Sequence, residues 1–212
     1  MIVEDLQTLE YREAWKLQED QHAAVAEGAE ERLLLVEHPP VITLGRRPGQ
    51  MKHVTAAAGP LQQARVDLVE SDRGGDVTYH GPGQLVAYPI IRLNDHRLSV
   101  GGYVRMLEQV VIATLADLGV EAQKDACAVG VWAMDRQKLA KICAIGVRIR
   151  RGVTMHGLAL NVTTNLDHFN LIIPCGLAGR TVTSLKRLLG ERAPTMEVVK
   201  STLVARMRAA LE

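Results

Sequence analysis

A short stretch of the chain, residues 73–84, reads R-G-G-D-V-T-Y-H-G-P-G-Q and places two glycine-containing loops around one histidine. Its glycines let the backbone approach a ligand closely or adopt positive φ, and its proline stiffens the second turn. For any single glycine pair, a tight β-connection that needs glycine only for turn geometry is the alternative. Four glycines around His80 favour a loop that holds a ligand against main-chain amides.

Cys175 lies between Pro174 and Gly176, which is typical of a sharp, exposed turn. A cysteine nucleophile acts as its thiolate, and a nearby cation or directed backbone amides favour that form. Burial as a small hydrophobic residue is the alternative, and the sequence leaves both open. The apolar neighbours of Cys143 are expected to bury it and keep it inert. Cys127, in a loop-like D-A-C-A segment, ranks below both.

Lys141 stands inside an otherwise apolar run, K-I-C-A-I-G. Partial desolvation there is expected to lower its pKa, so that it could act as a base. A strand-end lysine that extends its amine to water is the alternative. His38, His80 and His156 could each orient a ligand or serve a structural role, and their sequence neighbours do not separate these readings.

Composition narrows the classes of function. The chain has 212 residues and 47% hydrophobic residues, which is enough for one domain, 1–212, with a sizeable core. A net charge of +1 and few aromatic residues disfavour nucleic-acid binding. An acidic start with Glu4, Asp5 and Glu10, and no apolar run of about 20 residues, predict a cytoplasmic protein without a membrane partner.

The cysteines and histidines give no sign of a disulfide framework or a metal site. The three cysteines are an odd number without a C-x-x-C pair, and the seven histidines show no H-E-x-x-H spacing. The arginines can still form a local basic face that docks an acidic protein, although a solvated surface is the usual outcome. These arginines are Arg46, Arg47, Arg73, Arg148, Arg150 and Arg151.

Periodicity predicts the elements that position these residues. In the clearest helix, 103–118, apolar residues from Val104 onward recur at three- and four-residue steps, and Gly119 supplies a stop. This stripe is predicted to be core rather than part of a cofactor site. Helices are also expected at 11–26 and after Thr195, a candidate N-cap. Strands are expected at 33–37, 41–44, 65–69, 77–79, 84–91, 130–134, 142–150 and 158–162. Strands between flanking helices predict an α+β class with a mixed, largely antiparallel sheet.

Several motifs in this chain together resemble one known family. They are E-H-P-P-V-I-T-L-G (37–45), R-G-G-D-V-T-Y-H-G-P-G-Q-L-V-A-Y-P-I (73–90), G-V-W (130–132), K-I-C-A-I-G-V-R (141–148), H-G-L-A-L-N (156–161) and P-C-G (174–176). In this order they resemble the lipoyl(octanoyl) transferases, which move an octanoyl group from acyl carrier protein to a lysine of lipoyl domains. The motifs cover most of the chain, so chance similarity is a poor explanation.

The resemblance implies roles for individual residues. It makes Cys175 the nucleophile that carries the acyl group as a thioester. It makes Lys141 the residue that lowers the pKa of that thiol and moves the proton, and the K-I-C-A-I-G register favours Lys141 over Lys138. Residues of three segments are then expected to contact the acyl group. These are Arg73, Gly74, Gly75, Asp76, Val77, Thr78, Tyr79 and His80; Ala144, Ile145 and Gly146; and Gly157, Leu158 and Ala159.

The resemblance also implies a fold shared with lipoate and biotin protein ligases, and a place at the first step of endogenous protein lipoylation. The implied donor is octanoyl acyl carrier protein. The implied acceptors are the lipoyl domains of 2-oxoacid dehydrogenase E2 subunits and the glycine cleavage H protein. A thioester donor is already activated, so no cofactor is expected, and the sequence contains no G-x-x-x-x-G-K-[ST] loop.

Two other functions remain open from the sequence. An ATP-dependent lipoate or biotin protein ligase would use the same scaffold, but adenylation needs no cysteine, so the Pro-Cys-Gly turn favours the transferase. A non-catalytic module that captures acyl carrier protein through its arginines would need neither Lys141 nor Cys175.

Overall fold

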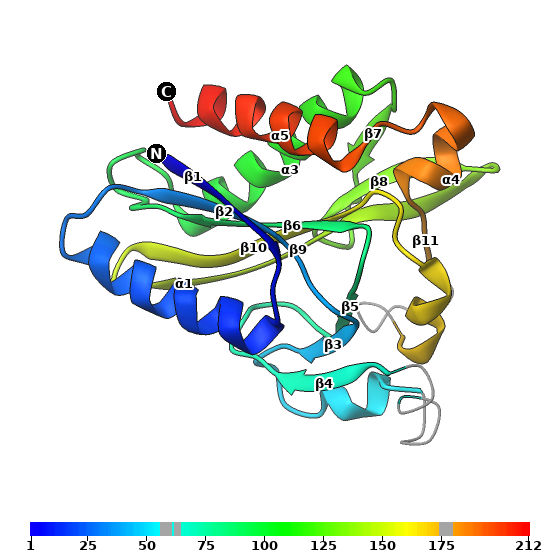
Figure 1. Cartoon of the computed structure of the whole chain (residues 1–212), viewed down its shortest axis with the longest axis horizontal. Helices are drawn as coiled ribbons and strands as arrows, with labels where there is room; N and C mark the ends of the chain where they lie inside the picture. The colour runs from blue at the N-terminus through cyan, green and yellow to red at the C-terminus, as the bar shows by residue number, and fades with distance from the viewer. Residues whose placement is uncertain (56–60, 62–64, 174–179) are drawn as a thin grey trace.

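A computed structural model describes residues 1–55, 61, 65–173 and 180–212, so Cys175 with both of its sequence neighbours lies outside the described residues. Within the described part, one large sheet has the strand order β1-β2-β6-β10-β9-β8-β7, with β11 beside β9, and a small sheet has the order β4-β3-β5 (Figure 1). The large sheet comprises β1 (Ile2–Thr8), β2 (Arg32–Glu37), β6 (Gln84–Ile90), β7 (Ala122–Lys124), β8 (Val131–Asp135), β9 (Lys138–Arg150), β10 (Val153–Asn161) and β11 (Thr181–Val182). The small sheet comprises β3 (Val41–Leu44), β4 (Asp67–Glu70) and β5 (Thr78–His80).

Helices cover both faces of the large sheet. The helix α1 (Tyr11–Ala26) lies on one face, and α3 (Val100–Asp117) and α5 (Met196–Leu211) lie side by side on the other (Figure 1). A short helix, α4 (Leu185–Leu189), precedes α5. Each helix buries apolar side chains against the sheet, so two aliphatic cores form, one on each side. The small sheet lies at one end of α1 and has a third apolar cluster of its own (Figure 1).

The strand pairing is mixed. The pairs β1–β2, β3–β4 and β9–β11 are parallel, whereas β2–β6, β6–β10, β9–β10, β8–β9 and β7–β8 are antiparallel. The predicted α+β class with a mixed, largely antiparallel sheet is therefore confirmed.

Some elements differ from the predicted ranges. The helix predicted at 103–118 begins earlier, at Val100, because the Ser99 hydroxyl accepts a hydrogen bond from the Gly102 amide at 3.0 Å and caps the helix there. The sequence pattern did not predict β1, β7, β11 or α4. These elements are short or lie at a sheet edge, where one row of backbone groups faces away from the sheet and strong apolar patterning is not needed.

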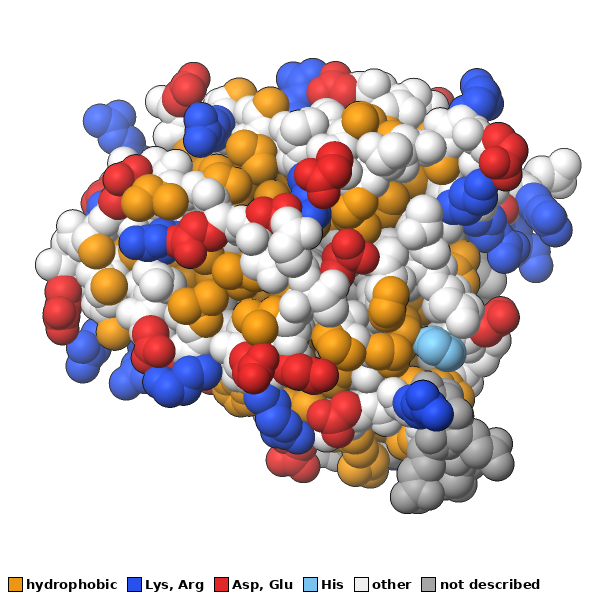
Figure 2. All heavy atoms as spheres, viewed as in Figure 1, with side chains coloured by type: hydrophobic (Ala, Val, Ile, Leu, Met, Phe, Trp, Pro, Cys, Tyr) orange, Lys and Arg blue, Asp and Glu red, His pale blue; other side chains and the backbone are white. Residues whose placement is uncertain are grey.

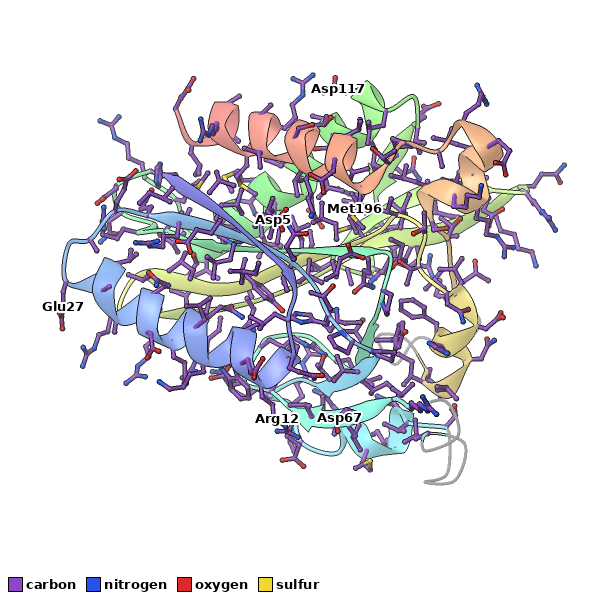
Figure 3. The ribbon with its side chains drawn as sticks, viewed as in Figure 1. Asp5, Arg12, Glu27, Asp67, Asp117 and Met196 are labelled. Atoms are coloured by element: carbon purple, nitrogen blue, oxygen red, sulfur yellow. The ribbon has the colours of Figure 1, made fainter. Side chains whose placement is uncertain are left out.

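The surface carries charges of both signs. On the face shown in Figure 2, Lys and Arg side chains alternate with Asp and Glu rather than forming a field of one sign. One such pair, Arg12 and Asp67, lies where the start of α1 approaches β4, with 3.9 Å between Nη2 and Oδ2 (Figure 3). Among the described residues, no helix has the length and apolar character needed to cross a membrane.

Candidate functional site

A cavity of about 460 Å³ opens where the glycine loop of residues 73–76 meets β9 and β10. Lys141 lines this cavity, and so does every residue predicted to contact the acyl group except Tyr79. Segments far apart in the sequence therefore share one wall. Their roles as contacts to the acyl group stay predictions.

Hydrogen bonds to backbone carbonyl groups hold the glycine loop in place. The Arg73 side chain, which is 6% exposed, donates from Nη2 to the Thr43 carbonyl at 2.6 Å and from Nη1 to the Gly74 carbonyl at 3.1 Å. The Gly74 amide donates to the Val147 carbonyl of β9 at 3.0 Å. The loop is therefore held between β3 and β9, and the Arg73 guanidinium positions the backbone of both the loop and β3.

Gly146 permits the close approach of the loop to β9. A Cβ atom at this position would lie 2.7 Å from the Gly74 carbonyl oxygen, which is too close for any side chain. Glycine at 146 therefore lets the loop backbone lie directly against the strand.

Lys141 is almost completely buried, at 6% exposed, on the strand β9. Its Nζ donates to the Val129 carbonyl at 2.9 Å and lies 4.8 Å from the centre of the Trp132 ring. Lys138, the alternative lysine, is exposed at the first position of β9. The lysine whose amine faces the cavity is therefore Lys141.

The three thiols have different environments. Cys143 is fully buried, and burial raises its pKa to about 12, in agreement with the inert role expected for it. Cys127 is exposed and lines the cavity together with Lys141, although the sequence ranked it last. Cys175, the predicted nucleophile, lies outside the described residues.

The histidines of the region are buried and neutral. Burial lowers the pKa of His38 to about 4, and the pKa values of His80 and His156 to about 3. His38 donates from Nδ1 to the Leu9 carbonyl at 2.7 Å and accepts from the Tyr88 hydroxyl at 2.8 Å. None of the three is poised to gain a proton near neutral pH.

Two of these histidines line the cavity and have polar partners. His80 donates from Nδ1 to the Gln84 side-chain carbonyl at 2.7 Å, and His156 donates from Nε2 to Asp72 at 2.7 Å. His156 has φ of 55°, and its amide donates to the Gln18 side chain of α1 at 2.8 Å. These contacts orient the imidazoles and favour a structural role for both.

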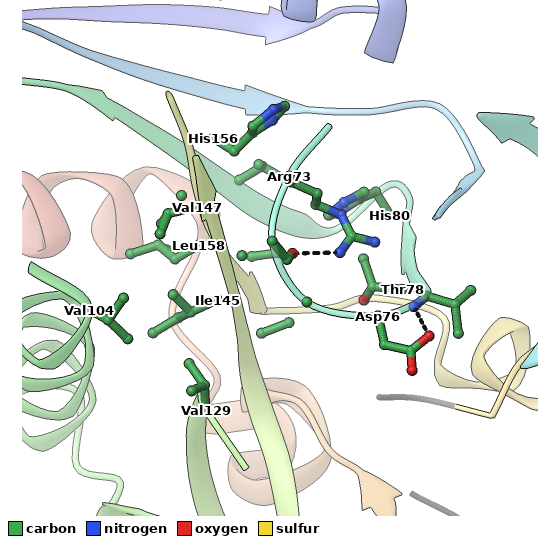
Figure 4. A pocket seen from close by; sticks show the side chains of 18 of the residues that line it. Arg73, Asp76, Thr78, His80, Val104, Val129, Ile145, Val147, His156 and Leu158 are labelled. Atoms are coloured by element: carbon green, nitrogen blue, oxygen red, sulfur yellow. Dashed lines mark hydrogen bonds between the residues drawn. The ribbon is translucent and has the colours of Figure 1, made fainter. Parts of the chain in front are cut away.

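One part of the cavity wall is apolar. Val104, Val129, Ile145 and Leu158 form a group separate from Arg73 in Figure 4. The prediction that the whole apolar stripe of α3 is core is therefore wrong at Val104, which is half-buried and faces the cavity. The helix begins at Val100, so Val104 lies in its second turn. A wall of branched aliphatic side chains suits an alkyl chain.

Tyr79 is oriented away from the cavity. It is 1% exposed, and its hydroxyl bonds to His168 Nδ1 at 2.7 Å within the apolar cluster of the small sheet. Alternation along β5 explains this, because neighbouring side chains on a strand point to opposite faces. Burial also raises the Tyr79 pKa to about 12, so the phenol stays protonated.

Sequence reasoning missed other residues of the wall. Tyr11 from α1 and Tyr88 from β6 line the cavity, as does Arg47 from the loop after β3. No signal in the sequence marks the two tyrosines of the wall, because nothing local separates them from Tyr79 and Tyr103, which lie in apolar clusters. Among the described residues, no cluster of three or more potential ligands offers a metal site.

Comparison with solved structures defines the class of protein. Lipoate-protein ligase A bound with ATP matches with a TM-score of 0.80 at 17% identity, covering 99% of this chain and 85% of that one. The biotin protein ligase of Aquifex aeolicus matches with a TM-score of 0.55 at 12% identity, covering 100% of this chain and 68% of that one. At such low identities these likenesses show the fold alone, the catalytic-domain fold of lipoate and biotin protein ligases.

Sequence comparison gives the family. Residues 10–208 match the family model of the lipoyl protein ligase A/B catalytic domain. A protein named octanoyltransferase from Chloroflexus aurantiacus is 47% identical over 209 residues, covering 98% of this chain and 92% of that protein. Another of that name, from Solibacter usitatus, is 49% identical over 191 residues, covering 90% and 84%. The chain belongs to the lipoyl protein ligase A/B catalytic domain family and, within it, groups with the octanoyltransferases, which are acyltransferases.

Proposed function

We propose that this chain, acting as one catalytic domain over residues 1–212, moves an octanoyl group from octanoyl acyl carrier protein to a lysine of a lipoyl domain. The acyl group is carried in between as a thioester on Cys175, and Lys141 moves the protons. The expected acceptors are the lipoyl domains of 2-oxoacid dehydrogenase E2 subunits and the glycine cleavage H protein. A cytoplasmic location belongs to the same proposal.

One observation carries this proposal. A single cavity brings the buried amine of Lys141 together with the glycine loop and with apolar side chains such as Ile145 and Leu158. An amine at the edge of an aliphatic wall suits a reaction at the carboxyl end of an alkyl chain. The octanoyltransferase name of relatives at 47% and 49% identity supports the same chemistry.

In the first step, the Cys175 thiolate attacks the carbonyl carbon of the carrier thioester after Lys141 has accepted the thiol proton. The new C–S bond forms, the C–S bond to the carrier breaks, and the carrier thiolate takes the proton back from Lys141. One thioester replaces another, so the step is nearly isoenergetic. Negative charge on the carbonyl oxygen needs N–H donors, and we propose the amides near Gly75 and Asp76 or beside Cys175.

In the second step, the neutral amine of the acceptor lysine attacks the Cys175 thioester. The C–N bond forms, the C–S bond breaks, and Lys141 accepts the proton that the amine loses. An amide replaces a thioester, so this step is strongly downhill. No nucleotide is consumed in either step.

The chain that follows the nucleophile runs beside the lysine, as the proposal requires. In the strand β11, Val182 pairs with Lys141, and the Thr183 amide donates to the Lys141 carbonyl at 2.9 Å. The Arg180 guanidinium lies 4.9 Å from the centre of the Trp132 ring, which also faces Lys141. These contacts support a reaction centre formed from both segments.

Intact-protein mass spectrometry after mixing with octanoyl acyl carrier protein tests the proposal. The wild type should gain the mass of one octanoyl group, and Cys175→Ser should lose nearly all turnover because a serine hydroxyl lacks an accessible anion. Lys141→Met should form the adduct far more slowly. Cys127→Ser is the matched control and should keep wild-type adduct formation, since its thiol is not assigned a role.

Several outcomes would contradict the proposal. Normal transfer by Cys175→Ser with no adduct on the wild type would exclude the thioester intermediate. Transfer that requires ATP and free octanoate would indicate a ligase. Tight carrier binding without any acyl transfer would indicate a binding module.

A further inference from the structure

We propose that Glu108 of α3 is a positioning residue for Lys141 and acts through the peptide group between Val129 and Gly130. This inference rests on the proposed role of Lys141 in proton transfer. It concerns a carboxylate that neither the motifs nor the cavity wall singles out.

The peptide group joins the two side chains directly. Its carbonyl, from Val129, accepts the hydrogen bond from Lys141 Nζ at 2.9 Å. Its amide, from Gly130, donates to Glu108 Oε1 at 3.2 Å. One planar peptide unit therefore has the amine of Lys141 at one end and the carboxylate of Glu108 at the other.

Gly130 is required for this arrangement. Its φ of 125° lies in a region that side chains rarely adopt. A Cβ atom there would lie 2.6 Å from the Cys143 carbonyl oxygen and 3.4 Å from Lys141 Nζ. Glycine thus allows the peptide to turn its carbonyl toward the amine while its amide meets the helix.

Glu108 lies at a position where an apolar residue would be expected. It is 7% exposed, and it follows Val104 by one helical turn on the face that also buries Leu107 and Val111. Burying a carboxylate costs free energy unless it is hydrogen-bonded, so packing alone gives no reason for a glutamate here. The hydrogen bond that it accepts from the Gly130 amide supplies a reason, because the same peptide group holds the Lys141 amine.

The carboxylate acts on the lysine in two ways. It fixes the peptide plane, and so the position of the carbonyl that holds Nζ. An N–H that donates to a negative charge also polarises its peptide and makes the carbonyl oxygen a stronger acceptor. Both effects keep the amine of Lys141 at one place in the cavity.

Other titratable and charged groups face the same region from the neighbouring elements. Cys143 lies nearby on β9, and its thiol is close enough to interact electrostatically with both Lys141 and Glu108. Arg180 contacts Trp132 and pairs with Asp125 at 2.9 Å. The remaining groups of this kind lining the cavity are Tyr11, Arg47, Arg73, Asp76, His80, Tyr88, Cys127 and His156.

Two substitutions separate position from charge. Glu108→Gln keeps a side-chain acceptor for Gly130 and removes the charge, so adduct formation should stay within a few-fold of wild type at its best pH. Removing the negative charge behind the Val129–Gly130 peptide should move the pH–rate profile of adduct formation to lower pH by about 0.5 to 1 unit, less than for a charge in direct contact with the reacting groups.

Glu108→Leu removes both the acceptor and the charge and suits the apolar face of α3. The rate of acyl-enzyme formation at saturating donor should fall by about 10- to 100-fold, as expected when a reacting group loses its position. The KM for the octanoyl carrier should change by less than about twofold. Glu121→Gln, which neutralises an exposed glutamate shortly after α3, is the matched control and should behave as wild type.

A readout independent of turnover completes the test. In protein labelled with ¹³C-lysine, the Lys141 resonance should change its chemical shift in Glu108→Gln and stay at the wild-type position in Glu121→Gln. If both the Lys141 resonance and the pH–rate profile stay unchanged in Glu108→Gln, the inference is wrong, even if Glu108→Leu does not fold. Absence of an acyl adduct on the wild type would instead contradict the proposed function.

Discussion

Individual residues around the cavity take their positions from backbone contacts. Arg73 bonds to the carbonyl groups of Thr43 and Gly74, and Lys141 bonds to the carbonyl group of Val129. Gly146 leaves room for the loop that Arg73 holds. The site therefore depends on side chains that hold backbone groups in place, so a small change in the shape of one residue should affect acyl transfer.

Gly146→Ala tests this dependence. The added Cβ would lie 2.7 Å from the Gly74 carbonyl oxygen, so the glycine loop must shift away from β9. We expect kcat/KM for octanoyl transfer to fall by about 10- to 100-fold, with a loss of about 1 to 3 kcal/mol in the free energy of unfolding. Steady-state kinetics and urea denaturation measure the two effects.

Gly101→Ala is the control for that substitution. Its Cβ would meet the flexible end of the Arg105 side chain at 3.3 Å inside α3, so both activity and stability should be retained. Wild-type activity in Gly146→Ala would show that the loop position does not matter for acyl transfer.

Among the secondary-structure elements, the helix α3 contributes to both the core and the cavity wall. Its middle packs on the large sheet through residues such as Leu107 and Leu115, while Val104 in its second turn lines the cavity. The start of the helix is fixed by Ser99. The cap therefore fixes where the helix starts, about one turn before Val104.

Ser99→Ala should destabilise the protein by about 1 kcal/mol, since the Gly102 amide loses its side-chain acceptor. Ser99→Thr keeps a hydroxyl and should lose much less. Urea denaturation of both variants compares them. Equal stability of Ser99→Ala and wild type would show that the cap contributes nothing to folding.

Several elements could be predicted from the sequence because their patterns were strong. The 11–26 helix and the strands 33–37, 41–44 and 84–91 agree with α1, β2, β3 and β6 to within one residue at each end. Strands such as β11 pair only through contacts between distant segments, so no local pattern reports them. The start of α3 also could not be read from its apolar stripe, because the N-cap Ser99 makes the helix begin before that stripe.

At the scale of the whole molecule, the buried neutral histidines make the free energy of unfolding depend on pH. His38, His80 and His156 come from different elements, and burial lowers all of their pKa values, to about 4 for the first and about 3 for the other two. The unfolded chain binds protons at these residues below its ordinary pKa of about 6.5, whereas the native protein does not. Acid should therefore favour unfolding.

The free energy of unfolding should decrease as pH falls from about 6.5 toward the native values. Each histidine contributes a limiting slope of about 1.4 kcal/mol per pH unit, because the unfolded state binds one more proton than the native state. Urea denaturation between about pH 7.5 and pH 5 measures this. His38→Gln should reduce this slope by about 1.4 kcal/mol per pH unit, the contribution of one proton. A free energy of unfolding that stays constant over this pH range in wild type would contradict the burial of neutral imidazoles.

The amino-acid sequence by itself determined which residue types can do the chemistry and which family they resemble, since motifs such as K-I-C-A-I-G and P-C-G are local and ordered along the chain. Tertiary structure decided which of them meet. It put Lys141 in the cavity wall, left Lys138 exposed, oriented Tyr79 away from the cavity and set Glu108 behind the Val129–Gly130 peptide. The physical reason is that strand register, loop approach and burial arise from contacts between distant segments, which no local pattern contains.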